Sequence, residues 1–260
     1  MKSIRTLVTV PAISAVVLSA WLSPDMTRAA DYGSVTGQFV LDGAIPKPKL
    51  LFAKGDPDAK DGEVCAAADR YSNKLVIDAK TKGIADIFIY LRKAPEDIHP
   101  DLKRSKVKEL TFDQVGCQFY PHSLFVRTDQ AVRVLSDDPL GHNTHTYPIK
   151  NVPVNFLLRP KDRVGVLVTV KVSEILPIQV KCDIHPWMRS NWLILDHPYA
   201  TITDKDGKFT IEKLPAGEHS FYVWHELVGY VDRKFKVTIP AGGTDAKDPV
   251  KVPLMRFEED

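Results

Sequence analysis

Short stretches of alternating or β-branched residues, each ended by a turn signal, recur along most of this chain. Nineteen prolines against fourteen glycines suit strands joined by turns better than long helices. No stretch predicts a helix longer than two turns. The pattern therefore predicts an all-β protein whose centre is a β-sandwich with Greek-key connections. We predict eight strands of this region over residues 108–112, 118–127, 131–135, 142–147, 154–158, 163–172, 178–182 and 190–195, and a further strand over 85–92 before the charged connector 93–106.

The segments on either side of the central region have a different pattern. A strand is predicted over 34–41, whereas 44–73 is predicted to be loop with at most one helical turn. Residues 200–211 (ATITDKDGKFTI) predict a hairpin with an Asp-Gly turn, and 214–217 (LPAG) predict a second turn. These two stretches resemble carboxypeptidase-regulatory-like (transthyretin-like) domains, whose pattern is T-x-x-D-x-D-G-x-F-x-I followed by L-P-A-G. The resemblance implies that the flanking segments build a second, smaller β-sandwich.

The first thirty residues predict a secretory signal peptide. A basic start precedes the apolar run Leu7–Leu22, and Thr27-Arg28-Ala29 places small residues at −3 and −1 of a signal-peptidase site. A membrane anchor is disfavoured because the run has roughly sixteen residues and a spanning helix needs about twenty. Removal of 1–29 takes away three basic residues and one acidic residue, so the net charge falls from +2 to 0. We expect a periplasmic or secreted chain without a transmembrane span and without nucleic acid as partner.

Three cysteines give an exported chain one thiol that a single internal disulfide cannot use. The economical arrangement is a Cys65–Cys117 disulfide with Cys182 left to bind metal. A cross-link between positions 52 apart in sequence contributes about 4 kcal/mol in the chain-entropy model. Pairing of Cys117 with Cys182, which leaves Cys65 as the unpaired thiol, remains an alternative.

Two motifs in the central region carry metal-binding chemistry. One is residues 181–189 (KCDIHPWMR), which place Cys182, His185 and Met188 within seven residues; the other is residues 142–145 (HNTH). One thiolate, one thioether and two imidazoles form the ligand set of a mononuclear blue-copper site. The alternative interpretation is a buried cysteine and a core methionine that flank a surface histidine. The combination of both motifs favours a copper site.

Together these motifs resemble the amicyanins of the cupredoxin family, which are related to plastocyanin, over about residues 107–196. The resemblance implies that His142, Cys182 and His185 bind copper, with Met188 as axial ligand. It also implies that Asn143 pins the two ligand-bearing segments together and that the second histidine of the first motif is not a ligand. Strand geometry independently favours that last point, because residues three apart on a strand point to opposite faces.

One departure from the family concerns Ile184, which stands where the family's loop has proline. Its backbone N–H could donate to the Cys182 sulfur, which a proline could not do.

These observations divide the chain into four parts and predict a function. The parts are a signal peptide (1–29), an N-terminal β segment with loop (32–105), a cupredoxin-like copper domain (106–198) and a carboxypeptidase-regulatory-like β segment (199–260). We expect a non-enzymatic protein that binds one copper ion and passes single electrons to or from a redox protein such as a cytochrome or a dehydrogenase. Alternatives are a copper carrier or storage protein and a non-redox β-sandwich interaction module.

Overall fold

The computed structural model describes residues 31–257, and the predicted signal peptide lies outside them. This part of the chain is all-β, as the sequence predicts. Its helical elements are the single turn α1 (Gly62–Cys65) and two short 3-10 helices, Pro100–Leu102 and Leu254–Arg256. Among the described residues, no helix has the length and apolar character needed to cross a membrane.

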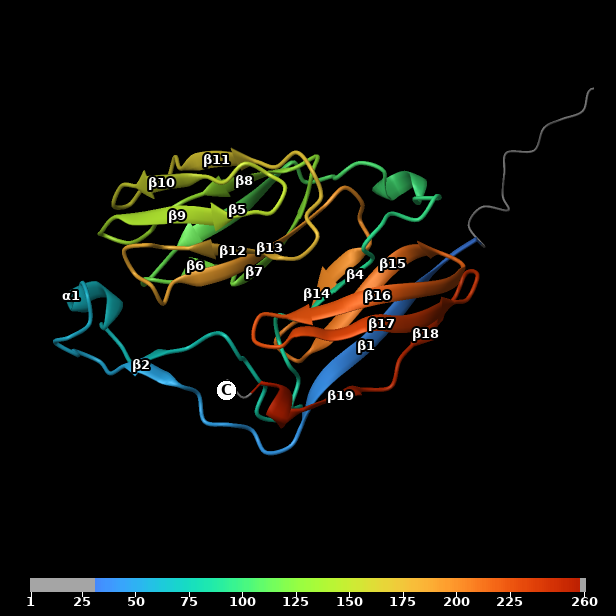
Figure 1. The fold of residues 1–260 in the computed structure, drawn as a ribbon, viewed down its shortest axis with the longest axis horizontal. Coiled ribbons are helices and arrows are strands. Elements are labelled where there is room, and N and C mark those ends of the chain that lie inside the picture. Colours follow the sequence, from blue (N-terminus) through green and yellow to red (C-terminus); the bar gives the residue numbers. More distant parts are fainter. Residues whose placement is uncertain (1–30, 258–260) are drawn as a thin grey trace, which may run out of the picture.

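The central region folds into two packed sheets, with strand orders β10-β9-β12-β13-β7 and β11-β8-β5-β6 (Figure 1). Parallel pairing of β13 with β7 and of β5 with β8 means that the chain crosses between non-consecutive strands. Trp192 and Phe112 are fully buried between the sheets, with ring centroids 5.0 Å apart in an edge-to-face arrangement. The strands are β5 (Glu109–Gln114), β6 (Phe119–Tyr120), β7 (Ser123–Arg127), β8 (Ala131–Val134), β9 (His142–Tyr147), β10 (Asn155–Leu158), β11 (Val166–Thr169), β12 (Ile178–Lys181) and β13 (Arg189–Leu195).

The flanking segments supply the strands of a second pair of sheets. One has the order β15-β1-β18 with β19 also paired to β1, and the other has the order β14-β4-β16-β17. Buried Phe88, Tyr90, Leu193 and Leu195 form an apolar cluster that joins the two sandwiches. The strands are β1 (Tyr32–Asp42), β4 (Phe88–Tyr90), β14 (Ala200–Ile202), β15 (Lys208–Pro215), β16 (Gly217–His225), β17 (Gly229–Ile239), β18 (Thr244–Ala246) and β19 (Val250–Pro253).

The hairpin predicted over 200–211 is wrong in one respect. Its Asp-Gly turn forms, since Gly207 N–H donates to Asp204 O over 2.9 Å and Gly207 has a φ of 76°. However, β14 pairs with β4 and β15 pairs with β1, so the turn passes between two sheets. The turn packs tightly on β1, because a Cβ on Gly207 would lie 2.3 Å from Phe39 O. Glycine is therefore needed both for the positive φ and for the close approach.

The strand predicted over 118–127 is also interrupted. A cis peptide bond between Tyr120 and Pro121 separates β6, which pairs with β5, from β7, which pairs with β13. Proline has no backbone N–H to give to a ladder, which explains the break. The strand predicted over 163–172 is shorter in the structure. Strands β17 to β19 and two short strands within the predicted loop 44–73 were not predicted.

Residues 50–72, called the cover segment below, leave the second sandwich and lie against one end of the central one (Figure 1). The segment contains α1 and a two-stranded ladder, β2 (Leu50–Phe52) with β3 (Arg70–Tyr71). The single helical turn agrees with the prediction for 44–73. A disulfide between Cys65 and Cys117 fastens α1 to the sandwich, which confirms the first of the two predicted pairings. Cys182 is the unpaired cysteine of the described residues.

Candidate metal centre

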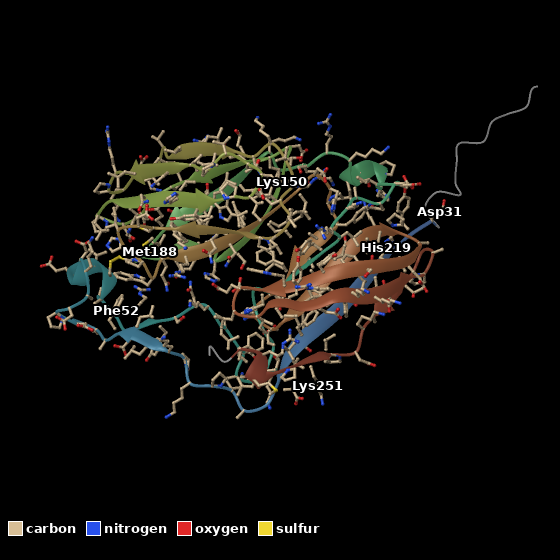
Figure 2. The ribbon with its side chains drawn as sticks, in the orientation of Figure 1. Asp31, Phe52, Lys150, Met188, His219 and Lys251 are labelled. Atoms are coloured by element: carbon tan, nitrogen blue, oxygen red, sulfur yellow. A yellow bond between two sulfur atoms is a disulfide. The ribbon has the colours of Figure 1, made fainter. Side chains whose placement is uncertain are left out.

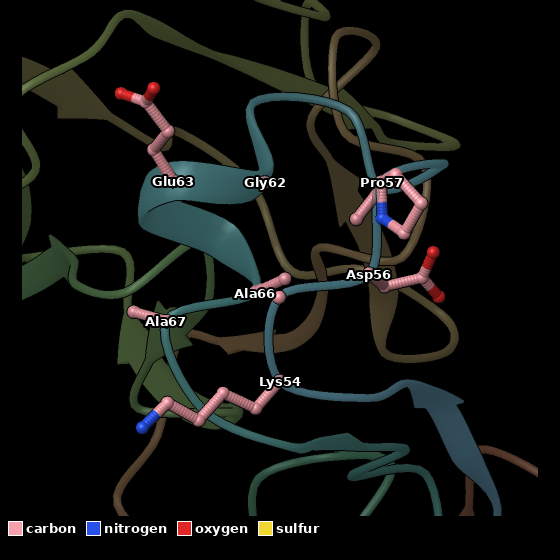
Figure 3. Close-up of a pocket in the computed structure, with 9 residues that line it drawn as sticks. Lys54, Asp56, Pro57, Gly62, Glu63, Ala66 and Ala67 are labelled. Carbon is pink, nitrogen blue, oxygen red and sulfur yellow. The ribbon is translucent and has the colours of Figure 1, made fainter.

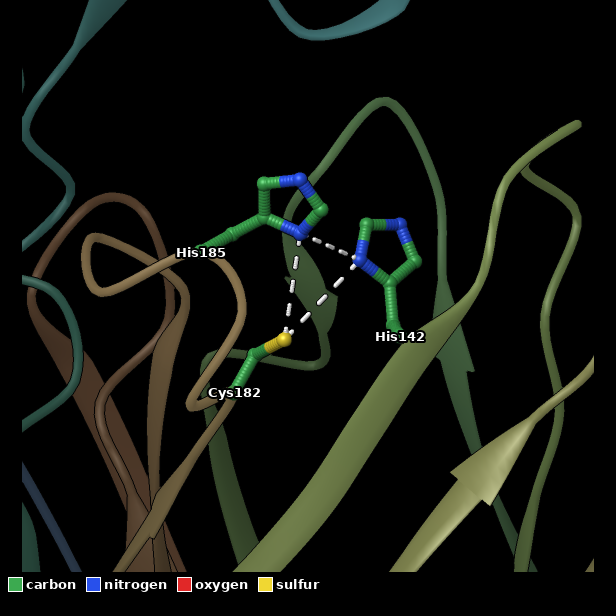
Figure 4. Close-up of side chains that lie close together, drawn as sticks. All are labelled: His142, Cys182 and His185. Atoms are coloured by element: carbon green, nitrogen blue, oxygen red, sulfur yellow. Dashed lines mark hydrogen bonds between the residues drawn. The ribbon is translucent and has the colours of Figure 1, made fainter. Parts of the chain in front are cut away.

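Three metal-binding side chains converge at one end of the central sandwich (Figure 4). His142 begins β9, Cys182 directly follows β12, and His185 lies in the turn that leads to β13. The two histidine Nδ1 atoms are 2.9 Å apart, and Cys182 Sγ lies 4.0 Å from His142 Nδ1 and 3.8 Å from His185 Nδ1. The exposed fractions of the three residues are 0%, 1% and 0% in chain order. Their donor atoms therefore share one buried point, all within 4.8 Å of one another.

The loop that carries Cys182, His185 and Met188 is held by its own backbone. Strands β12 and β13 pair as far as Lys181 and Arg189, so residues 182–188 close the hairpin. Cys182 N–H donates to Met188 O over 3.2 Å, and Met188 N–H donates to His185 O over 2.9 Å. Met188 is 1% exposed and belongs to the same core cluster as Cys182 and Phe52 (Figure 2). This geometry fixes the loop before any ligand binds.

Each imidazole is held from its far side by a carboxylate. His142 Nε2 is 2.7 Å from Asp138 Oδ2, and His185 Nε2 is 2.8 Å from Asp61 Oδ2. Asp138 also accepts a hydrogen bond of 2.8 Å from the backbone N–H of Cys117, so it connects the disulfide to the site. A carboxylate on the remote nitrogen fixes ring orientation and tautomer and makes the other nitrogen a stronger ligand. Both Nδ1 atoms are thereby directed at Cys182 Sγ.

The surroundings favour the thiolate form of Cys182. Burial alone would raise the pKa of this thiol, but hydrogen bonds from His142 and His185, together with backbone N–H groups, lower it to about 6. For His142, burial acts to lower the pKa, and the Asp138 carboxylate and the Cys182 sulfur more than offset this and raise it. The backbone N–H groups that contribute most to this shift are those of His185 and Asn143. A hydrogen bond from Ile184 N–H to the sulfur stays a prediction.

Asn143 joins the two segments that carry the site. Its Oδ1 accepts from Asp183 N–H over 2.7 Å and lies 3.3 Å from Cys182 Sγ. Its Nδ2 donates to Asp183 Oδ2 and to Asn155 Oδ1, both over 2.8 Å. This is the pinning role that the sequence resemblance implies for Asn143.

His145 lies outside the convergent group. Its Nδ1 is 3.0 Å from Asp183 Oδ2, and its side chain is 27% exposed, whereas that of His142 is fully buried. The alternation of β9 accounts for this difference, since the two histidines are three residues apart.

One residue near the site went unrecognised in the sequence. Asp61 lies 124 positions from His185, and no motif marks it as a partner. Asp137 and Asp138 before Pro139 predict a turn near His142, where a carboxylate ligand is conceivable; in the structure Asp138 contacts the remote nitrogen of His142. Cys117, Asp138 and His142 also lie close together, but Cys117 is disulfide-bonded and offers no thiolate.

The donor set suits a copper ion. One thiolate and two imidazoles are soft and borderline ligands of the kind that accept both Cu(I) and Cu(II). The residues that would hold the ion are His142, Cys182 and His185, with buried Met188 at the end of the same loop.

No protein-family model matches the chain, and the comparison with curated proteins finds no match. Among solved structures, a reduced amicyanin variant is 14% identical, with a TM-score of 0.30, and the match covers 34% of this chain and 82% of amicyanin. A purple cupredoxin from Nitrosopumilus maritimus is 14% identical, with a TM-score of 0.27, over 33% of this chain and 98% of the cupredoxin. A copper-containing nitrite reductase from Thermus scotoductus SA-01 is 16% identical, with a TM-score of 0.30, over 40% of this chain and 25% of the reductase. These low scores carry no argument about function.

Proposed function

We propose that this chain is an exported cupredoxin-like protein that carries single electrons on one copper ion bound by His142, Cys182, His185 and Met188. The observation that supports it most is the convergence of two histidine Nδ1 atoms on a buried cysteine sulfur at the end of a β-sandwich. The Cys65–Cys117 disulfide supports an oxidising compartment, either the periplasm or the exterior. The partner would be a redox protein such as a cytochrome or a dehydrogenase.

The residues around the site perform three tasks in this proposal. The hydrogen bonds to Cys182 keep it in its thiolate form near neutral pH. Asp138 and Asp61 hold the two imidazole rings, and Asn143 locks the two segments, so the ligands move little. Full burial excludes water from the donor atoms. Copper, when bound, supplies a one-electron couple between Cu(I) and Cu(II).

The alternatives fit the site less well. A copper carrier must hand its ion to an acceptor, and ligand residues with exposed fractions of 0% and 1% are poorly placed for direct ligand exchange. In an interaction module without redox function, the lowered pKa of the Cys182 thiol would serve no purpose. The same holds for the two imidazoles beside it, each of which is bound by a carboxylate. With four ligands from the protein, no open position for a substrate is proposed, so we expect no enzymatic activity.

The test is a copper titration of the mature protein and three variants. We expect one tight copper per chain in the wild type and loss of the intense thiolate-to-copper absorption in Cys182→Ser. His142→Ala should weaken copper binding far more than the matched variant His145→Ala, because His145 contacts Asp183 outside the group. Equal losses at the two histidines would contradict the proposed ligand set.

A further inference from the structure

The cover segment contacts the candidate metal centre from outside the central sandwich. Asp61 at the start of α1 bonds to His185, and the Phe52 ring packs edge-to-face on Trp187, with centroids 4.9 Å apart. Trp187 in turn stacks obliquely on His185 at 5.2 Å and donates its Nε1–H to Cys117 O. The segment therefore lies over the His185 imidazole, which is fully buried.

Asp61 has the residue type and position of a helix N-cap, yet its carboxylate does not cap α1. Its backbone adopts the left-handed conformation, with a φ of 53°, which is rare and costly for a residue other than glycine. Aspartate at this position ordinarily stabilises a helix through a side-chain hydrogen bond to the first turn. Here that stabilisation is given up, and the carboxylate reaches His185 instead.

The cover segment is otherwise weakly anchored. Its outer loop encloses an open hollow of about 440 Å³ lined by residues of the segment itself (Figure 3). Most residues from 53 to 63 are exposed, and α1 has one turn. The fixed points are the disulfide at Cys65, the Phe52 contact, the Asp61 bond and the packing of the small side chains of Ala59 and Val64 on the central core. A short, exposed loop with few buried contacts belongs to the part of a protein that opens most easily.

We propose that the cover segment is a gate over the metal centre and that Asp61 is the positioning residue that keeps it closed. The disulfide holds the base of the gate, and the outer loop, residues 53–63, swings away when the bond between Asp61 and His185 breaks. Metal ions and other reagents then reach Cys182 only through the open form. The gate acts on the metal-free protein as well, so it can be tested independently of the proposed electron transfer.

The experiment measures the rate at which an aromatic disulfide reagent labels Cys182 in metal-free, disulfide-intact protein. Asp61→Ala should raise the rate about tenfold, the effect of losing one partly exposed charge-assisted hydrogen bond. Asp61→Asn, which keeps an oxygen acceptor, should give an intermediate rate. Asp58→Ala is the matched control, because Asp58 is an exposed carboxylate of the same loop with no contact to His185.

A second measurement separates gate opening from a change in thiol reactivity. Limited trypsin cleavage after Lys54, whose neighbouring residues are the same in every variant, reports opening of the outer loop and does not depend on the thiol, so it should accelerate in Asp61→Ala by a similar factor. Release of bound copper to an excess of a strong chelator should accelerate in the same order of variants. Labelling and cleavage rates in Asp61→Ala that equal the wild type, or an equal increase in Asp58→Ala, would overturn the gate. If the protein fails to bind copper but the labelling and cleavage rates change as expected, the proposed function is contradicted and the gate is not.

Discussion

His225 is a buried histidine whose titration should make the folded protein less stable in mild acid. Its ring, at the end of β16, is 1% exposed and packs at a right angle on Phe257 with centroids 5.2 Å apart. Its Nδ1 accepts from Leu227 N–H over 3.3 Å, and its Nε2 is buried without a hydrogen-bond partner among residues 31–257. Burial lowers the pKa of this histidine to about 4.

Protonation of His225 favours the unfolded state over the folded state. The unfolded chain, with a histidine pKa of about 6.5, binds the proton more tightly than the folded chain. The contribution of His225 to stability is therefore complete above pH ~6.5 and is lost as the pH falls toward ~4. Between pH 7 and pH 5 the loss amounts to about 2 kcal/mol of the free energy of unfolding.

The assay is urea unfolding of wild type and His225→Asn at both pH values, with the disulfide intact. Asparagine keeps an acceptor for the Leu227 N–H and does not titrate. The comparison with a variant is needed because His122 changes the pH dependence of stability in the opposite direction. Burial lowers the His122 pKa, but the Glu226 carboxylate more than offsets this, and the net shift is upward. Wild type should lose about 2 kcal/mol more than the variant; an equal loss in both would refute the reasoning.

Two further predictions concern the disulfide and a buried carboxylate. Thiol counting on denatured, metal-free, non-reduced protein should find one free thiol, which peptide mapping should assign to Cys182; three thiols would contradict the bridge between Cys65 and Cys117. Glu174→Gln should lower the free energy of unfolding by about 2 kcal/mol in urea denaturation. The reason is that the buried Glu174 carboxylate accepts hydrogen bonds from the backbone N–H groups of residues 149–151. An unchanged midpoint would show that these bonds contribute nothing.

The sequence predicts the all-β class because its alternation and turn signals are local. It also predicts which side chains meet at the centre: Cys182 and His185 share one short loop, and strand parity separates His142 from His145. Which strands pair with one another is harder to predict from the sequence. The turn at Gly207 has the sequence of a hairpin, but contact with β1, remote in the chain, directs its two strands into different sheets.

The carboxylate partner of His185 could not be predicted for the same reason. Asp61 is an ordinary residue of a polar loop in the sequence, and only the disulfide between Cys65 and Cys117 brings that loop to His185. The donors to the Cys182 sulfur depend on the exact path of the loop, which residue types alone do not determine. The sequence therefore predicts the converging groups better than it predicts what holds and covers them.

The central claim is that His142, Cys182 and His185 hold one redox-active copper. The most direct test is a reductive titration of the copper-loaded mature protein, followed by visible absorption and electron paramagnetic resonance. The account predicts an intense thiolate-to-Cu(II) band at one copper per chain, which disappears after one electron and returns on reoxidation. A weak band that persists in Cys182→Ser, or copper that cannot be reduced reversibly, would contradict the account.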